Sequence, residues 1–221
     1  MTRQELLAQI ASRLSGSGVE FGAGAYPFPA TGCHVRFADR NTQTELRDRK
    51  YFGDAKLIEP DLISDLETMD GISDNSLNFI IASHVIEHTR NPLLALENAY
   101  RKLRHGGQFV LVVPDMVVTF DRDRQLTPLE HLTLDYADPS NERDFHHYVE
   151  FFEKSFPQPD PLESARSVHE RGDDIHFHTW TYESFQDMVK YSLRSISPWV
   201  DTWYHPRLSD QDIEFYAVLR K

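Results

Sequence analysis

The sequence has 221 residues, enough for one large α/β domain with a full hydrophobic core. Its 35 acidic and 23 basic residues give a net charge of −12, which disfavours a nucleic-acid partner because an acidic surface repels phosphate backbones. The single cysteine, Cys33, excludes an internal disulfide framework and suits a reducing compartment. We find no signal peptide and no apolar run of membrane-spanning length, so we expect a cytoplasmic protein without a membrane span.

Strands and helices alternate along most of the chain. Capping motifs, turn residues and hydrophobic periodicity predict where they begin and end. The expected strands lie at about 19–22, 34–39, 61–65, 77–83, 108–113, 196–204 and 213–220, and the expected helices at about 2–14, 91–104, 127–136 and 181–192. This order predicts an α/β fold, with a mostly parallel sheet covered by helices on both faces.

Two segments depart from a regular alternation. Pro27 and Pro29 forbid a full helix between the first two strands, so the usual crossover helix there must be missing or reduced to a turn. Residues 115–176 are rich in His, Asp, Pro and aromatic residues, and we interpret them as an insertion after the fifth strand of a single domain, 1–221. The aromatic residues of this insertion predict a small hydrophobic core more strongly than a platform for stacking sugars. They are Tyr148, Phe151, Phe152 and Phe156.

A Gly-x-Gly turn, Gly22-Ala23-Gly24, follows the first strand, whose one acidic residue is Glu20. Glycines let the backbone N–H groups approach a bulky ligand because no side chain stands in the way. Asp39 ends the second strand 19 positions after Glu20, the spacing at which a carboxylate accepts hydrogen bonds from the hydroxyls of a ribose. The pattern therefore predicts a nucleotide-like cofactor.

Four segments resemble the motifs of class I S-adenosylmethionine-dependent methyltransferases. In chain order they are Glu20–Gly24, His34–Asp39, Phe79–His88 and Leu103–Leu111. The third is similar to the strand and H-x-x-E-H-like turn of the broad "type 11" group. Each motif is weak alone, but four in the right order make a specific signal. The resemblance implies a Rossmann-like class I methyltransferase fold with seven strands and S-adenosylmethionine as the cofactor.

The same resemblance implies roles for the cofactor-binding residues. The backbone of 22–24 would approach the amino-acid end of the cofactor, with Glu20 beneath it facing the ammonium group. Asp39 would accept hydrogen bonds from both ribose hydroxyls. The shortened first helix would leave the cofactor's carboxylate without much help from a helix dipole. The remaining expected contacts are Asp65 and Leu66 at the adenine edge and Ser83 and His84 near the sulfonium.

Residues after the fifth strand resemble a subgroup linked to sugar and polysaccharide pathways. They are Pro114, Asp115, Thr119–Arg122, Arg124, Thr127, His131 and Asp135. We therefore expect methyl transfer to a hydroxyl of a small polar acceptor, such as a sugar or glycan precursor. Three alternatives stay open: an N- or natural-product methyltransferase, a non-catalytic cofactor-binding module in a glycan assembly complex, and a nicotinamide-dependent oxidoreductase. The two prolines of the first crossover and the closing strand pair disfavour the oxidoreductase.

Transfer to a hydroxyl benefits from a base within hydrogen-bonding reach. His131 is the first candidate, because Asp135 lies four residues on along the same helical face and can orient the imidazole; a mere surface contact is the alternative. His84 is the second, at the carboxyl end of the fourth strand, where open α/β sheets bind their ligands. His176 and His178 come third.

His84 and His88 have the spacing of a metal-binding pair on a helix. Methyl transfer from a sulfonium needs no metal, however, and no matching third ligand stands out in the sequence. We therefore expect no metal site, and we expect Glu87, between the two histidines, to hold the turn after the fourth strand or to touch a ligand. Nothing in the sequence predicts an oligomeric state.

Overall fold

A computed structural model describes residues 1–50, 52–138 and 143–221 of the chain. Its seven-stranded sheet has the order β3-β2-β1-β4-β5-β7-β6, in which β7 runs antiparallel to both of its neighbours. The strands are β1 Ser17–Phe21, β2 His34–Asp39, β3 Leu62–Ile63, β4 Leu77–Ser83, β5 Leu103–Pro114, β6 Asp201–His205 and β7 Glu214–Arg220. The predicted mostly parallel α/β fold is confirmed.

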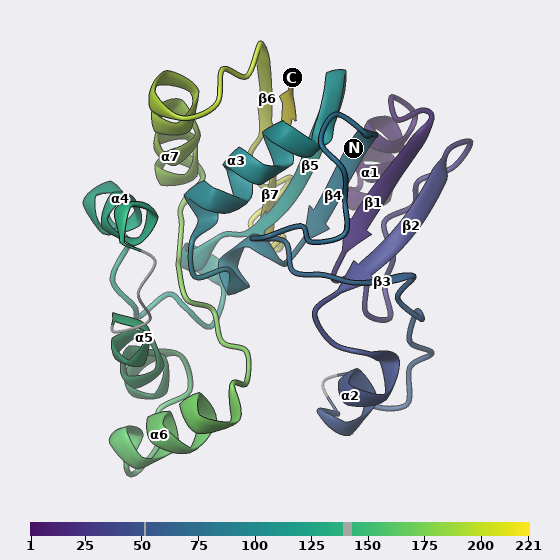
Figure 1. Cartoon of the computed structure of the whole chain (residues 1–221). Coiled ribbons are helices and arrows are strands. Elements are labelled where there is room, and N and C mark those ends of the chain that lie inside the picture. The colour runs from purple at the N-terminus through teal and green to yellow at the C-terminus, as the bar shows by residue number, and fades with distance from the viewer. Residues whose placement is uncertain (51, 139–142) are drawn as a thin grey trace.

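Helices cover both faces of the sheet (Figure 1). On one face lies α1 (Arg3–Ala11), and on the other lie α3 (Pro92–Lys102) and α7 (Tyr182–Ser195). Strand β4 is buried between them, and its successive residues serve opposite faces. Ile80 packs in the cluster that contains α3 and α7, whereas Ile81 packs in the cluster that contains α1. A strand buried on both faces is therefore continuously apolar in its middle, as β4 is from Phe79 to Ala82.

The segment between β1 and β2 contains no helix, although all of its residues, 22–33, are described. The missing crossover helix that Pro27 and Pro29 predict is thus confirmed. A short helix, α2 (Gln43–Asp48), follows β2 instead, capped by Thr42. It lies beyond the carboxyl ends of the parallel strands (Figure 1).

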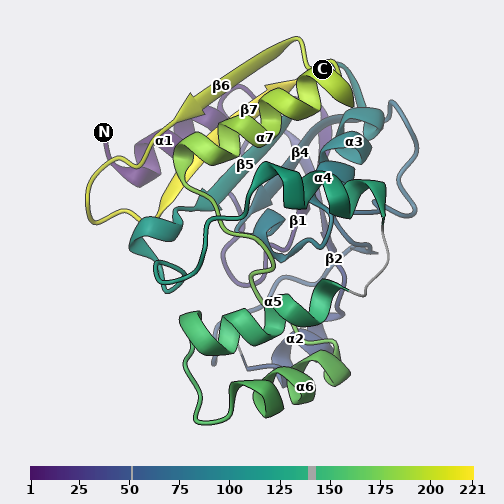
Figure 2. The same ribbon diagram turned by 90° about the vertical axis from the view of Figure 1, so that its left-hand side faces the viewer.

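Most of the remaining helices lie between β5 and α7, within the predicted insertion. They are η2 Met116–Val118, α4 Leu129–Ala137, α5 Asp144–Glu150, the π-helical turn η4 Phe151–Ser155 and α6 Pro161–Arg171; the short η1 Ile86–His88 follows β4. Figure 2 shows α4 beside α3 and α7, and α5 beside α6. Tyr148 and Phe177 are buried in a small core of the insertion, against which Phe151 and Phe152 pack. The predicted core is thus present, but Phe156, which was predicted to belong to it, is 46% exposed.

Two local predictions are wrong. The sequence Thr127-Pro128-Leu129-Glu130 predicts a capping box that begins with Thr127, but the N-cap of α4 is Pro128, and the Thr127 side chain accepts a hydrogen bond from the backbone N–H of Thr179 instead. Strand β6 begins at Asp201 and not near residue 196. Trp199, before it, packs against helix α3 instead, where it stacks edge-on against Tyr100 with the ring centroids 5.1 Å apart, while Val200 is 67% exposed.

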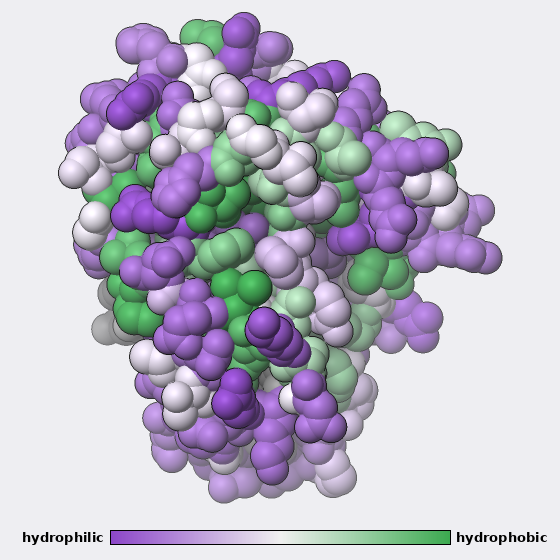
Figure 3. Space-filling view, turned by 90° about the vertical axis from the view of Figure 1, so that its right-hand side faces the viewer, coloured by the Kyte–Doolittle hydropathy of each residue, from purple (hydrophilic) through white to green (hydrophobic). Residues whose placement is uncertain are grey.

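None of the helices within the described residues is long and apolar enough to cross a membrane. Figure 3 views the molecule from the side of the β2 edge. Hydrophilic residues dominate the lower part of this face, and hydrophobic residues reach the surface mainly in its middle. This face therefore carries both hydrophilic and hydrophobic residues at its surface.

Candidate active site

A cavity of about 310 Å³ opens at the carboxyl ends of β1, β2 and β4. A second one, of about 790 Å³, adjoins it, since Gly22, Phe52 and His84 line both. The predicted cofactor residues on the first are Gly22, Asp39, Asp65, Leu66 and His84, and those on the second are Glu20, Gly22, Ala23, Ser83 and His84. Only Gly24 of the predicted set lines neither. The strand order brings these residues together, because parallel strands end at one edge.

Asp39 ends β2 at the wall of the smaller cavity. Its Oδ1 accepts hydrogen bonds from the backbone N–H of Asn41 at 2.8 Å and from the Asn41 side chain at 3.3 Å, which fix the carboxyl group. Burial raises its pKa and outweighs these bonds. Asp65 lies on the same cavity and is held by the backbone N–H of Glu67 at 2.7 Å. Two oriented carboxylates thus face a space that the sequence assigns to ribose and adenine.

The glycine turn has no room for side chains. Gly22 has φ +65°, and a Cβ added to it would lie 2.6 Å from a methyl group of Val85. Gly24 has φ +53°, and a Cβ there would collide with the ring of Phe52. Both positions therefore need glycine for the local backbone, and Gly22, which lines both cavities, also lets the backbone approach a ligand.

We expect the change Gly22→Ala to weaken cofactor binding and to lower the free energy of unfolding by about 2 kcal/mol. A non-glycine residue in this conformation costs about 1–2 kcal/mol, and Val85 must also move. Gly32→Ala is the matched control, because Gly32 has φ +74° but nothing within 4 Å of an added Cβ. Urea unfolding and calorimetric titration measure both effects. Equal losses in the two variants, with equal cofactor affinity, would contradict the prediction.

Glu20 lies beneath the turn, 1% exposed. Its Oε1 accepts a hydrogen bond from the backbone N–H of Phe28 at 2.8 Å, whereas Oε2 has no partner among the described residues. Burial raises the pKa of this carboxyl to about 7 and outweighs the bond from Phe28. Because Glu20 also lines the larger cavity, its free oxygen suits an ammonium group of a ligand.

His84 follows β4 with the left-handed backbone angle φ +55°, which its side chain tolerates at some cost. Its Nε2 lies 2.7 Å from Oε2 of Glu214, the first residue of β7. Glu214 also accepts hydrogen bonds from Arg3 Nε at 2.6 Å and from the hydroxyl of Tyr216 at 2.7 Å. The carboxylate therefore holds the proton on Nε2 and leaves Nδ1 to accept one.

The charges of this pair support the same arrangement. Burial lowers the pKa of His84, but the hydrogen bond to Glu214 and the nearby charge of Glu87 outweigh it, so the pKa is raised overall. Burial raises the pKa of Glu214, but its bonds from His84 and Arg3 bring it down to about 2. Glu214 is ionised and can stabilise a protonated His84. Glu214 could not be predicted as a site residue, because nothing in the sequence of the last strand marks it as the partner of His84.

His131 and Asp135 pair on α4 as predicted. His131 Nε2 lies 3.0 Å from Asp135 Oδ2 and 3.1 Å from Nε2 of His147 on α5. Asp135 Oδ1 also accepts a hydrogen bond from Arg143 Nε at 2.9 Å. Neither member of the predicted pair lines the two cavities. His178, buried, stacks on His147 in this same group, with the ring centroids 5.1 Å apart.

His176 belongs to a different group, beside the smaller cavity. Its ring packs edge-on against that of His88, which lines the cavity, with the centroids 4.7 Å apart. Its Nδ1 lies 2.6 Å from Asp121 Oδ2. Burial lowers the pKa of His88 to about 3, with a smaller contribution from His176. Burial also raises the pKa of Glu87, next to His88 in the sequence.

Two ion pairs close the cavity on the side of the insertion. Arg40 lies 2.6 Å from Asp174, and both residues line the smaller cavity. Arg49, at the end of α2, pairs with Asp173 at 3.0 Å. The segment after α6 is thereby tied to the segment after β2, and it forms part of the wall around the ligand space.

The sheet order, the glycine turn and the acid that ends β2 define a protein of the S-adenosylmethionine-dependent methyltransferase class. A family model described as "Methyltransferase domain" matches residues 2–192, and the chain belongs to this family. The chain is an S-adenosylmethionine-dependent methyltransferase domain. Its residues fit the cofactor, because Gly22 exposes bare backbone at the wall of both cavities and Glu20 has one oxygen unpartnered among the described residues.

Solved structures with the same fold include two carbon methyltransferase domains and one archaeal protein. The citrinin polyketide synthase CMeT domain and the CurJ carbon methyltransferase each have a TM-score of 0.52 and 14% identity, over 98% of this chain and 50% and 52% of theirs. The chain thus spans about half of their length. A SAM-dependent methyltransferase from Archaeoglobus fulgidus has a TM-score of 0.52 and 12% identity, over 99% and 92%. Such identities show the fold alone. No curated protein matches the sequence.

Proposed function

We propose that the protein transfers a methyl group to a hydroxyl of a small polar acceptor, with a sugar or glycan precursor as the favoured class. The observation that carries this proposal is the His84–Glu214 pair beside the cofactor cavities. S-adenosylmethionine supplies a methyl group on a positively charged sulfur, and the transfer releases an uncharged thioether. The protein must therefore position the acceptor, exclude water and take up one proton.

The cavity residues would hold the cofactor through complementary charges. Asp39 would accept hydrogen bonds from the ribose hydroxyls, and Asp65 with the Leu66 N–H would contact the adenine edge. Glu20 would face the ammonium group. No helix dipole serves the cofactor's carboxylate, because residues 22–33 are not helical. Arg3, from α1, lines the same cavity as Glu20 and would supply the positive charge instead.

His84 would take the proton of the acceptor hydroxyl on Nδ1. Its Nε2–H stays bonded to Glu214, which would stabilise the imidazolium that forms. Arg3 and Tyr216 hold Glu214 in place and keep it ionised. His131 stays a second proposal for the role of the base, although it lies outside both cavities. A turnover assay on the His131→Ala variant decides between the two histidines.

Two exposed aromatic side chains support an acceptor of the sugar type. Phe120 and Phe156 are 43% and 46% exposed, and their ring centroids lie 4.9 Å apart. Phe120 also contacts His176, at 4.7 Å between centroids, so this apolar surface adjoins polar groups at the edge of the cofactor cavity. Sugar rings bind to such surfaces through their C–H faces while their hydroxyls meet polar groups.

The test is transfer of an isotope-labelled methyl group from S-adenosylmethionine. The acceptor panel contains monosaccharides, nucleotide sugars and phenols on one side, and primary amines of similar size on the other. We expect label in a hydroxyl-bearing product and none with a His84→Asn variant. Label in amines alone would overturn O-methylation in favour of N-methylation. Cofactor binding without transfer to any member would favour the non-catalytic binding module.

We expect cofactor binding to be linked to the ionisation of Glu20. With its pKa at about 7 in the free protein, the carboxyl is mostly neutral at pH 5.5, whereas an ammonium group favours the ionised form. Affinity for S-adenosylmethionine should therefore rise by up to about tenfold per unit as the pH rises toward 7, and then level off. Titration in buffers of different ionisation enthalpy should detect proton release. Glu20→Gln should bind more weakly and without this slope; a flat wild-type profile would remove Glu20 from the site.

A further inference from the structure

Glu87 is a buried carboxyl whose oxygens find no hydrogen-bonding partner among the described residues. Its side chain is 1% exposed, and neither Oε1 nor Oε2 has a partner within the described part of the chain. Buried carboxyls are nearly always hydrogen-bonded, paired with a charge or bound to a metal, because the loss of hydration is otherwise uncompensated. The surroundings of Glu87 must therefore supply something that the side chains alone do not.

Three imidazole rings surround this carboxyl. Oε1 of Glu87 lies 3.8 Å from His84 Nδ1 and 4.0 Å from His176 Nε2, both too far for a hydrogen bond. The ligand atoms of Glu87, His88 and His176 all lie within 4.8 Å of one another. The three ligands come from the turn after β4 and from the end of the insertion, so the fold, not local sequence, assembles them.

The protons of the rings are already committed elsewhere. His176 Nδ1 lies 2.6 Å from the Asp121 carboxylate, and His88 Nδ1 lies 2.9 Å from the carbonyl oxygen of Ile175. Both partners are acceptors, so each ring carries its proton on Nδ1 and presents a lone pair on Nε2. Two lone pairs and a carboxylate therefore converge without a donor among them. A cation satisfies all three at once.

We propose that Glu87, His88 and His176 bind a divalent transition-metal ion beside the cofactor cavity. Two imidazoles and one carboxylate are a common donor set for zinc, manganese or iron, and three protein ligands leave coordination positions open. Asp121 and the Ile175 carbonyl orient the two rings in the way that outer-shell partners of metal ligands do. Asp121 is itself fixed by the hydroxyl of Ser155 at 2.7 Å.

The location of the ion gives it a part in recognition of the acceptor. His88 lines the cofactor cavity, so the open positions adjoin the space where methyl transfer occurs. An acceptor with two neighbouring oxygen atoms, as in a vicinal diol or hydroxy acid, would complete the coordination. The ion lowers the pKa of the bound hydroxyl. The hydroxyl's proton passes to His84 Nδ1, and its oxygen bonds to the methyl carbon as the C–S bond of the cofactor breaks.

A second group could also hold a metal ion, and it provides the control. It consists of His131, Asp135, His147 and His178, and it lines neither cavity. There, His131 Nε2 lies 3.0 Å from Asp135 Oδ2 and 3.1 Å from His147 Nε2, so a proton on it is within hydrogen-bonding distance of two acceptors. This group thus has a donor of its own, although Asp135 Oδ2 and His178 Nδ1 also have no hydrogen-bonding partner of suitable geometry among the described residues. Its variants should leave binding at the proposed site unchanged.

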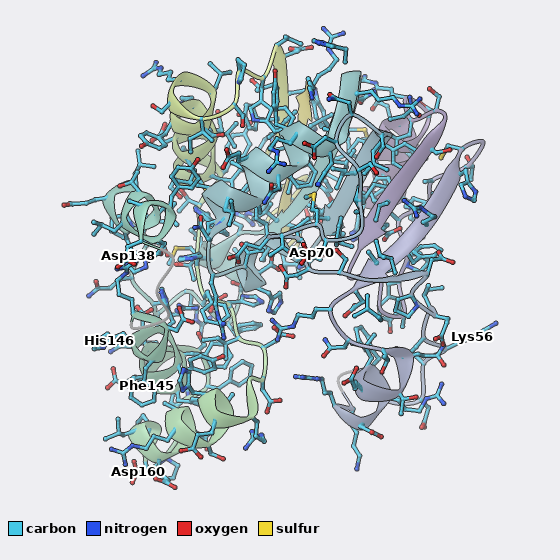
Figure 4. The ribbon with its side chains drawn as sticks, in the orientation of Figure 1. Lys56, Asp70, Asp138, Phe145, His146 and Asp160 are labelled. Carbon is cyan, nitrogen blue, oxygen red and sulfur yellow. The ribbon has the colours of Figure 1, made fainter. Side chains whose placement is uncertain are left out.

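The experiment uses untagged protein stripped with a chelator and titrated by calorimetry with Zn²⁺, Mn²⁺ and Co²⁺, each alone. We expect one tight equivalent per chain that Glu87→Gln and His176→Gln each weaken at least about 100-fold. His147→Gln is the control for the other group. His146→Ala is the control for a surface histidine, because His146 is exposed on the outer side of α5 (Figure 4). Titration with S-adenosylmethionine verifies that every variant is folded.

The outcomes separate the two proposals. Absence of metal binding to the wild type, or unchanged binding in Glu87→Gln, overturns the metal site. If His147→Gln loses metal binding while Glu87→Gln retains it, the ion belongs to the other group, and the proposed site is overturned as well. The binding of the metal ion does not depend on the proposed function; only the class of acceptor that the ion would recognise rests on it. Metal binding without transfer to any hydroxyl would therefore leave the site standing and overturn the function alone.

Discussion

Replacing Asp39 by Asn should raise the Kd for S-adenosylmethionine by roughly 10²- to 10⁴-fold. Hydrogen bonds to a charged group contribute about 1.5–3 kcal/mol each, and two ribose hydroxyls would lose them, or about 3–6 kcal/mol in all. The substitution preserves shape, and the amide oxygen can still accept the bond from the Asn41 N–H. The loss should therefore fall on the ligand and not on the fold.

Calorimetric titration with S-adenosylmethionine and S-adenosylhomocysteine measures this effect. Asp54→Asn is the matched control, since Asp54 is exposed on the segment after α2 and lines neither cavity. Its affinity should equal that of the wild type. Unchanged binding in Asp39→Asn would show that the acid at the end of β2 does not contact the ribose. A parallel titration with NAD should show no binding.

Replacing His84 by Asn should lower kcat by about 10²- to 10⁴-fold, the usual contribution of a general base. Asparagine is chosen because it accepts the left-handed backbone at φ +55° better than most residues, so the turn after β4 stays intact. Its amide cannot take up a proton. We expect the Kd for S-adenosylmethionine to change by no more than a few-fold, because binding rests on Asp39 and Glu20.

The measurement is steady-state transfer to an acceptor returned by the isotope screen. Glu214→Gln tests the positioning role of the carboxylate, and we expect a smaller fall in kcat with little change in KM. His131→Ala, measured alongside, decides between the two candidate bases. If His131→Ala abolishes turnover while His84→Asn does not, the base is His131 and the insertion must move over the cavity.

Most of the residues predicted for the cofactor lie together around two adjoining cavities, because their signals in the sequence are local, while their contacts with the cofactor stay a prediction. Gly22, Glu20 and Asp39 lie within 20 positions of one another, and the strand order carries them to one edge of the sheet. The loss of the first crossover helix could also be predicted, since Pro27 and Pro29 act directly on the backbone. Short-range physical chemistry decides all of these features.

The acceptor side could be predicted much less well. His84 meets Glu214 across 130 positions, and only the antiparallel pairing of β7 with β5 brings Glu214 there. His176 reaches Glu87 through an insertion whose helices α5 and α6 were not predicted, although Asp160 caps α6 and Gly172 ends it. Thr127 shows the same limit on a smaller scale, because a tertiary hydrogen bond from Thr179 took the place of the predicted cap.

The ion pairs that tie Arg40 to Asp174 and Arg49 to Asp173 have a consequence for the proposed metal site. The segment that they anchor continues directly into His176 and Phe177. Asp174 lies two positions before His176, so a movement that opens this wall would also displace a proposed metal ligand. The ion pairs therefore link the wall of the cofactor cavity mechanically to the proposed metal site.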